Sequence, residues 1–219
     1  MAVSKQAYEQ IITDFGSRHV TLVAVSKTKS VEEIKQLYDL GQRDFGENYV
    51  QELVGKRSML PADIRWHFIG HLQTNKVKQV VPFISLVQSV DSLKLLQEID
   101  KQAKKIGREV DCLLQVHIAQ EETKFGFSEN ELDQVIRTLE ELPVKNAHVK
   151  GLMGMASFTD DMKKVRTEFR YLKSLFDKFS SRWSGLDTLS MGMSSDYSVA
   201  IEEGSTMVRI GSLIFGARI

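Results

Sequence analysis

Residues 21–40 read TLVAVSKTKSVEEIKQLYDL, a short apolar run followed by a stretch of helical length. Residues 21–25 are rich in β-forming types, which favours a buried strand. Residues 31–40 place apolar side chains at helical spacing, and Ser30 stands three residues before Glu33, the spacing of a capping box. This segment therefore predicts one strand followed by one helix.

The same strand–helix unit recurs along the chain. Strands are predicted at residues 21–25, 42–46, 66–70, 86–90, 111–118, 149–153, 188–191 and 207–210. Helices are predicted at residues 31–40, 48–59, 75–80, 92–106, 129–141, 160–179 and 196–203. A second capping box is formed by Ser128 and Glu131. We therefore predict an α/β fold with one domain over residues 1–219, a single parallel (β/α)8 TIM-type barrel with an extra N-terminal helix over residues 3–15. An open doubly wound sheet is the alternative.

The composition is that of a globular protein with small partners. Hydrophobic residues make up 42% and charged residues 26% of the chain, and 29 basic side chains balance 29 acidic ones. This balance excludes a global positive field that gathers nucleic acid or anionic membranes. Cys112 is the only cysteine, and no apolar run approaches the roughly 18 residues of a membrane span. We expect a cytoplasmic protein, and the lack of a heptad run favours a monomer.

Lys27 is the first candidate for chemistry. In a parallel barrel the active site lies at the C-terminal ends of the strands, and Lys27 comes directly after the first strand and Ser26. Partial desolvation at such a position favours the neutral amine, the nucleophile that forms a Schiff base with an aldehyde. A solvated lysine at the start of a loop is the alternative. Lys29, two residues on, is expected at the surface.

The loops after the last two strands form a second candidate group. Ser194 and Ser195 follow the seventh strand, while Gly211 and Ser212 follow the eighth, which ends with Arg209 and Ile210. These two loops form the common phosphate site of TIM barrels, because glycines let the backbone approach an anion and hydroxyls donate to it. The serines could instead cap the next helix, and the glycines could be turn residues.

An amine and a phosphate site on opposite sides of one mouth suit an aldehyde cofactor that carries a phosphate. NAD and ATP fit less well, because the sequence has neither GxGxxG nor GxxxxGK[ST] after a predicted strand.

Other side chains near strand ends are weaker candidates. Asn48 could contact a cofactor ring or cap a helix, and His71 could be a base or a wall of the site. Met153 ends the sixth strand, and Lys124, on the loop after the fifth, could reach an anion or be solvated. His67 lies inside a strand and is expected to be a structural histidine. The five histidines lack the compact spacing of metal ligands, so we expect no metal.

Six motifs spread over nearly the whole chain resemble the pyridoxal phosphate homeostasis proteins, the YggS/PROSC family. They read AVSK (24–27), FGENYVQE (45–52), WHFIGHLQTNK (66–76), GLM (151–153), SMGMS (190–194) and GSTMVRIG (204–211). Phe125 departs from the pattern, since many members carry a small residue there, beside the lysine that matches Lys124.

By this resemblance, Lys27 carries pyridoxal 5′-phosphate (PLP) as a Schiff base, and Ser194 with Gly211 and Ser212 holds the phosphate. Arg209 would lie beside the pyridine nitrogen, where a cation weakens the ring as an electron sink. The family resembles the barrel domain of alanine racemase standing alone, so we expect no second domain after Ile219 that would supply another catalytic base.

The resemblance thus implies a protein of vitamin B6 homeostasis that buffers PLP or delivers it to apo-enzymes, with no established turnover. A PLP-dependent enzyme acting on an unidentified amino acid is the alternative. A third possibility is a cofactor-free barrel that binds another phosphate ester.

Overall fold

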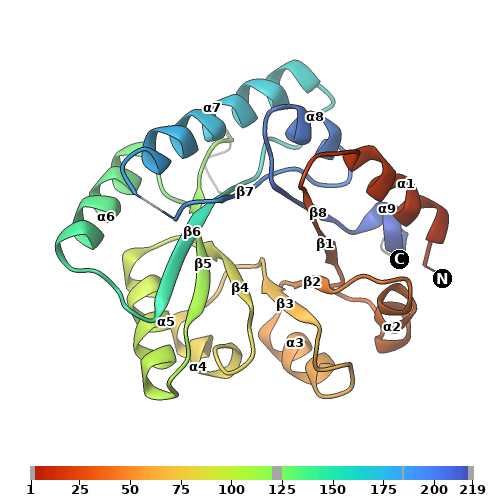
Figure 1. Cartoon of the computed structure of the whole chain (residues 1–219), viewed down its shortest axis with the longest axis horizontal. Coiled ribbons are helices and arrows are strands. Elements are labelled where there is room, and N and C mark those ends of the chain that lie inside the picture. The colour runs from red at the N-terminus through yellow and green to blue at the C-terminus, as the bar shows by residue number, and fades with distance from the viewer. Residues whose placement is uncertain (1–2, 120–124, 184, 217–219) are drawn as a thin grey trace.

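A computed structural model describes residues 3–119, 125–183 and 185–216, and within them eight parallel strands close into a barrel (Figure 1). The strands are β1 Thr21–Val25, β2 Asp44–Glu47, β3 Arg65–Phe68, β4 Leu86–Val90, β5 Val110–Val116, β6 Ala147–Gly154, β7 Thr188–Ser190 and β8 Met207–Ile210. Closure comes from β1 pairing with β8, in register from Thr21 opposite Met207 to Ala24 opposite Ile210. The predicted barrel is confirmed, and the open doubly wound alternative is wrong.

Helices cover the outside of the barrel (Figure 1). They are α1 Lys5–Phe15, α2 Val31–Asp39, α3 Val50–Arg57, α4 Val77–Val80, α5 Leu93–Lys105, α6 Glu129–Glu141, α7 Met162–Ser180, α8 Tyr197–Glu202 and α9 Ser212–Phe215, and a 3-10 turn, η1 Thr74–Lys76, precedes α4. The predicted N-terminal helix is α1, which Figure 1 shows beside α9, and Ser4 N–H donates to the Ile214 carbonyl oxygen at 2.9 Å. In the described part of the chain, no helix has both the length and the apolar character that crossing a membrane requires.

Local hydrogen bonds decide where several elements begin. The Ser30 and Ser128 side chains each accept from the backbone of the glutamate three residues on, and that glutamate accepts in return, so both predicted capping boxes are confirmed. The second strand begins at Asp44 rather than at residue 42. Gln42 instead closes the turn before it, since its side-chain Nε2 donates to the carbonyl oxygens of Leu22 and Asp44 at 2.7 and 2.6 Å.

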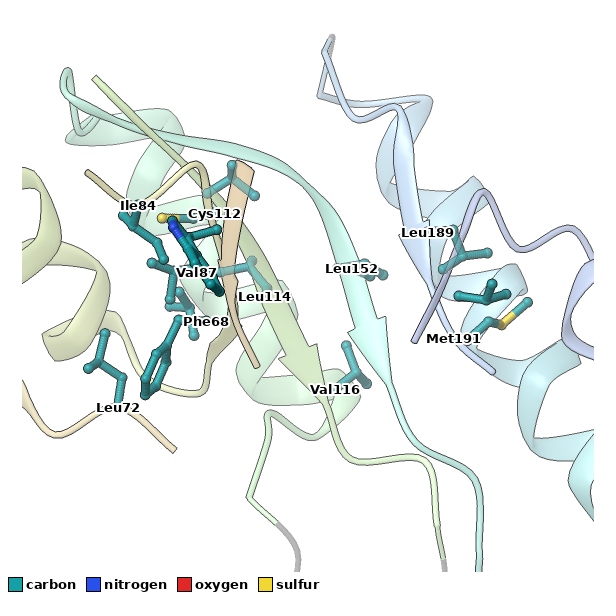
Figure 2. Packing of buried hydrophobic residues seen from close by; sticks show 14 of the residues in the cluster. Phe68, Leu72, Ile84, Val87, Cys112, Leu114, Val116, Leu152, Leu189 and Met191 are labelled. Carbon is teal, nitrogen blue, oxygen red and sulfur yellow. The ribbon is translucent and has the colours of Figure 1, made fainter. Parts of the chain in front are cut away.

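Two apolar layers follow from the alternation of side chains along each strand. On β5, Cys112, Leu114 and Val116 face the helices, in the cluster of Figure 2, whereas Leu113 points into the barrel. The interior cluster consists of Val23, Leu86, Leu113, Met153 and Met207. Side chains that continue the inward face past a strand's C-terminal end therefore emerge at the mouth of the barrel.

Candidate functional site

A cavity of about 390 Å³ opens at the C-terminal ends of β1 and β8, within the roughly 300–1,000 Å³ of small-molecule pockets. Six of the nine predicted cofactor residues line it, namely Lys27, Ser194, Ser195, Arg209, Gly211 and Ser212. The other residues in its wall are Val25, Lys29, Phe158, Met193 and Gly216. The structure thus brings the predicted amine and both predicted phosphate loops to one cavity.

Strand alternation directs Lys27 toward this cavity. Val23 lies in the barrel interior and Val25 lines the cavity, and Lys27 continues the same face as a half-buried side chain. Ser26 faces the other way, and its Oγ donates to the buried Glu47 Oε1 at 2.6 Å. Lys27 is thus half-buried at the cavity rather than fully exposed.

Charged side chains of α3 hold the backbone on both sides of Lys27. Lys56 Nζ donates to the Ser26 carbonyl oxygen at 2.7 Å. Thr28 has a left-handed φ of 64°, and its N–H donates to Glu52 Oε1 at 2.5 Å. Because few non-glycine residues adopt positive φ, this geometry depends on its neighbours. Helix α3 therefore positions the lysine.

Lys56 is the centre of a buried ion cluster. Its Nζ lies 2.8 Å from Glu47 Oε1 and 2.5 Å from Glu52 Oε1. Burial raises the pKa of the fully buried Glu47, against the attraction of Lys56. Glu47 Oε2 has no hydrogen-bond partner among the described residues. Sequence reasoning missed this cluster, although the i,i+4 spacing of Glu52 and Lys56 is a signal that could have found half of it.

The loops after β7 and β8 are tied to each other. Gly211 N–H donates to Ser194 Oγ at 3.3 Å, and Arg209 N–H donates to the Gly192 carbonyl oxygen at 3.0 Å. The N-cap of α8 is Asp196, so neither Ser194 nor its neighbour Ser195 caps that helix and the capping alternative is wrong. The two loops form one joined cradle.

Glycine is required at one position of this cradle and favours close approach at another. Gly192 has a φ of +97°, and a Cβ there would lie 2.5 Å from the Ala200 Cβ. A Cβ on Gly211 would lie only 3.1 Å from the Val25 carbonyl oxygen. Glycine at this position therefore lets the start of α9 pack closely against the end of β1. The unpredicted α9 begins with the exposed Ser212, which lines the cavity.

Arg209 is a buried cation in the cavity wall. It is 4% exposed, and its guanidinium donates to Ser190 Oγ at 2.5 Å and to the Gly154 carbonyl oxygen at 3.0 Å. Burial lowers the pKa of Arg209 to about 10, with the nearby Asp196 opposing the change. The side chain is therefore still charged at neutral pH.

Lys29 is not a surface group, and that expectation is wrong. Its side chain is 13% exposed, and Nζ donates to the Phe215 carbonyl oxygen at 2.9 Å. This bond fastens the C-terminal end of α9 to the loop after β1. It was not predictable because the partner lies at the other end of the sequence.

Asn48 and His71 line a second, smaller hollow of about 200 Å³ at the ends of β2 and β3. Asn48 precedes the Tyr49 N-cap of α3, so the helix-capping alternative is wrong, and its Oδ1 is buried without a partner among the described residues. His71 Nδ1 lies 2.8 Å from Asp91 Oδ2, and its ring stacks on Phe125 at 4.2 Å. The structure does not place these two residues in the cavity of Lys27.

The remaining candidates are dispersed. Met153 is fully buried in the barrel interior and lines neither hollow. Lys124 lies outside the described residues. His67 is hydrogen-bonded on both ring nitrogens, to Asp44 and Gln88, as expected of a structural histidine. Within the described ranges, no three His, Cys, Asp or Glu side chains gather as metal ligands.

Known proteins resemble this chain over nearly its whole length. The family "alanine racemase, N-terminal domain" matches residues 5–219. The pyridoxal phosphate homeostasis protein of Pasteurella multocida is 41% identical over 206 residues, 91% of this chain and 87% of that protein. The protein of the same name from Aquifex aeolicus is 42% identical over 205 residues, 93% of this chain and 89% of that one.

A solved structure agrees with these relatives. PipY of Synechococcus elongatus PCC7942, with PLP bound, is 32% identical with a TM-score of 0.86, covering 96% of this chain and 100% of that chain. These matches confirm the resemblance that the six motifs predicted. The chain belongs to the alanine racemase N-terminal domain family and, within it, to the pyridoxal phosphate homeostasis proteins.

Proposed function

We propose that this protein binds PLP in the cavity at β1 and β8 and takes part in intracellular PLP homeostasis, buffering the cofactor or delivering it to apo-enzymes. The observation that carries the proposal is a single cavity that holds both Lys27 and the joined cradle of Ser194 and Gly211. The aldehyde and the phosphate of PLP need different partners at opposite ends. The names of the relatives and the PLP bound to PipY support the same cofactor.

The residues present fit both ends of this cofactor. The hydroxyls of Ser194, Ser195 and Ser212, with the N–H groups at the start of α9, suit a phosphate. Lys27 would hold the aldehyde end, since an amine can condense with an aldehyde to a C=N bond with release of one water. Asn48, His71 and Met153 stay predictions as ring contacts. Asn48 Oδ1, which is buried and has no partner within the described ranges, has the character of a polar group that a ligand completes.

The cavity favours a carrier over a catalyst. PLP, when bound, supplies an electron sink through its ring. By the family resemblance Arg209 would lie beside the ring nitrogen, where its cation would disfavour protonation of that nitrogen and weaken the electron sink. The described residues that line the cavity include no carboxylate, imidazole or phenol, so a second proton-transfer group besides the lysines is lacking there.

Borohydride reduction tests cofactor attachment. After incubation with PLP and reduction, peptide mass spectrometry should find one pyridoxyl group on Lys27, and Lys27→Ala should abolish it. Lys35→Ala is the matched control, because Lys35 is an exposed helix lysine paired with Asp39. A wild-type protein with no adduct, or with one on many lysines equally, would overturn the proposal and favour a barrel for another phosphate ester.

Transfer to an apo-enzyme tests the carrier role. We expect the loaded protein to restore an apo-enzyme's activity at the same rate with and without a PLP-trapping agent, because handover is direct. Complete loss of transfer under trapping contradicts delivery. The alternative function, a PLP-dependent enzyme acting on an unidentified amino acid, predicts Lys27-dependent exchange of an α-proton with solvent deuterium, and no exchange across a broad panel counts against it.

We also propose that residues 1–219 act as one domain, as a monomer, in the cytoplasm. The buried Cys112 and the balanced charge support an intracellular setting and small partners. Light scattering after size exclusion checks the monomer, and cell fractionation checks the compartment.

A further inference from the structure

Five buried polar side chains form a continuous hydrogen-bonded chain across the barrel interior. At the cavity, Arg209 Nη1 donates to Ser190 Oγ at 2.5 Å. Ser190 Oγ donates to Gln88 Oε1 at 2.7 Å, and Gln88 Nε2 lies 3.0 Å from His67 Nδ1. His67 Nε2 lies 3.0 Å from Asp44 Oδ1. This polar chain links β8, β7, β4, β3 and β2 in one path.

The polar chain is deeply buried along its length. The Asp44 side chain, the most exposed of the five residues, is 12% exposed, and Ser190 and Gln88 are fully buried. At its far end, Asp44 Oδ1 accepts from Arg65 Nε at 2.8 Å, and the Arg65 side chain is 56% exposed. The path therefore runs from the cofactor cavity to solvent near the opposite end of the strands, through an interior where hydrogen bonds are electrostatically strong.

The first half of the polar chain runs from Arg209 toward Gln88. Arginine carries donors and no acceptor, so Ser190 Oγ accepts from Arg209. The Ser190 hydroxyl donates to Gln88 Oε1, and in this arrangement Gln88 Nε2 is turned away from the serine. Nε2 also lies 3.2 Å from Met207 Sδ, a second acceptor that agrees with this orientation.

The direction of hydrogen-bond donation in the second half of the polar chain follows from that in the first half. Because Gln88 Nε2 is a donor, His67 Nδ1 must accept, which leaves the imidazole hydrogen on Nε2. Nε2–H then points at the Asp44 carboxylate, which only accepts. Asp44 thus anchors one consistent order of donors and acceptors that ends at the guanidinium of Arg209.

We propose that Gln88 and His67 are positioning residues for the cofactor, which act through Ser190 to hold the Arg209 guanidinium in its orientation in the cavity wall. The proposal rests on the proposed function, because it concerns PLP in the same cavity. Arginine has five N–H donors, and the bonds to Ser190 and to the Gly154 carbonyl oxygen use two of them in fixed directions. The directions of the other three follow from the planar group.

Packing of the barrel interior does not by itself explain why Gln88 and His67 are polar. Bulky branched apolar residues dominate the interiors of such barrels, and a buried polar group is costly unless every partner is in place. Gln88 and His67 are absent from the described lining of the cavity, so they affect PLP only indirectly, and the polar chain connects them to Arg209, which does line it.

The first arm of the test uses the protein without PLP. Nitrogen-15 NMR of the imidazoles should show His67 as the neutral Nε2–H tautomer at neutral pH. Gln88→Glu places a carboxylate oxygen opposite His67 Nδ1, and this variant should convert His67 to the doubly protonated form. An Nδ1–H tautomer in the wild type, or an unchanged tautomer in Gln88→Glu, overturns the assigned direction.

The second arm measures PLP. Gln88→Leu and His67→Phe should weaken PLP binding roughly tenfold, equivalent to about 1.4 kcal/mol, and shift the absorption maximum of the bound cofactor. His67→Gln should restore both readouts, because its amide can accept from Gln88 and donate to Asp44. Leu113→Met, an interior change outside the polar chain, is the control and should leave both readouts unchanged.

The outcomes separate the positioning role from the proposed function. If the wild type forms the Lys27 adduct but Gln88→Leu and His67→Phe match Leu113→Met in affinity and spectrum, the positioning role is refuted. The same holds if His67→Gln is as defective as His67→Phe. If the wild type binds no PLP, the proposed function fails and the positioning role fails with it, whereas the NMR arm still decides the donor direction.

Discussion

Lys56→Met isolates the ion cluster behind Lys27. Lys56 has a side-chain exposure of 7% and neutralises Glu47, whose side chain is 0% exposed. Methionine keeps the length and apolar stem of lysine but leaves the Glu47 carboxylate buried with neither oxygen bound to a cation. Breaking a buried pair in this way costs about 3–5 kcal/mol. In a protein of this size that corresponds to a fall in Tm of roughly 6–20 °C.

A double-mutant cycle shows whether the cost comes from the stranded charge. Glu47→Gln with Lys56→Met removes both charges of the pair and should recover most of the stability that Lys56→Met loses. Urea unfolding followed by circular dichroism, without PLP, gives the free energy of unfolding of each variant. Lys35→Met is the matched control, because Lys35 belongs to an exposed i,i+4 pair and its loss should cost less than about 1 kcal/mol.

Two results would refute the reasoning about the ion cluster. One is a loss for Lys56→Met as small as that of Lys35→Met. The other is a double variant whose loss equals the sum of the two single losses, since that means Glu47 and Lys56 do not interact. PLP binding gives a further check, because the Ser26 carbonyl oxygen loses its partner and Lys27 becomes less well placed.

Three further predictions concern other parts of the molecule. Gly192→Ala forces a side chain into a left-handed backbone position, so it should destabilise the cradle by about 1–3 kcal/mol and weaken PLP binding. Gly55→Ala is the control, because a Cβ there meets open space, and equal PLP titration curves for the two variants would contradict the prediction. Burial raises the pKa of the Cys112 thiol, so thiol reagents should react with it only in denaturant, and rapid labelling of the native protein would be contrary evidence. Burial raises the pKa of Asp44, but hydrogen bonds from His67 and a neighbouring arginine outweigh it and lower that pKa overall. The resulting stability is present above the ordinary carboxyl pKa and lost as pH falls through the lowered value, so Asp44→Asn should flatten the fall of unfolding free energy in acid, and an unchanged pH profile would disprove it.

The fold was predictable because its signals are local. Each strand shows as a short apolar run, and each helix as a period with a cap, as in residues 21–40. Helix α9 was missed because four residues are too few to show a period. The cradle was predictable for a related reason, since the ends of neighbouring strands in a barrel must meet at one mouth.

The rest of the site depends on pairings that no local pattern shows. Gln88 meets Ser190 only because β4 and β7 face each other across the interior, and the two lie far apart in sequence. The contact of Lys29 with α9 likewise joins the two ends of the chain. Asn48 and His71 were correctly placed near strand ends, but which hollow each side chain lines is decided by its position around the mouth.

The pairing of β1 with β8 makes the cavity a late product of folding. Its lysine comes from the first strand and its anion cradle from the last, so neither half is a binding site until the longest loop in the molecule has closed. During synthesis the ribosome must therefore have made β8 before any cofactor can bind in this cavity. Because the cofactor binds only the closed barrel, its binding energy adds to the stability of that closure. A chain in which the first and last strands did not pair would bind no cofactor.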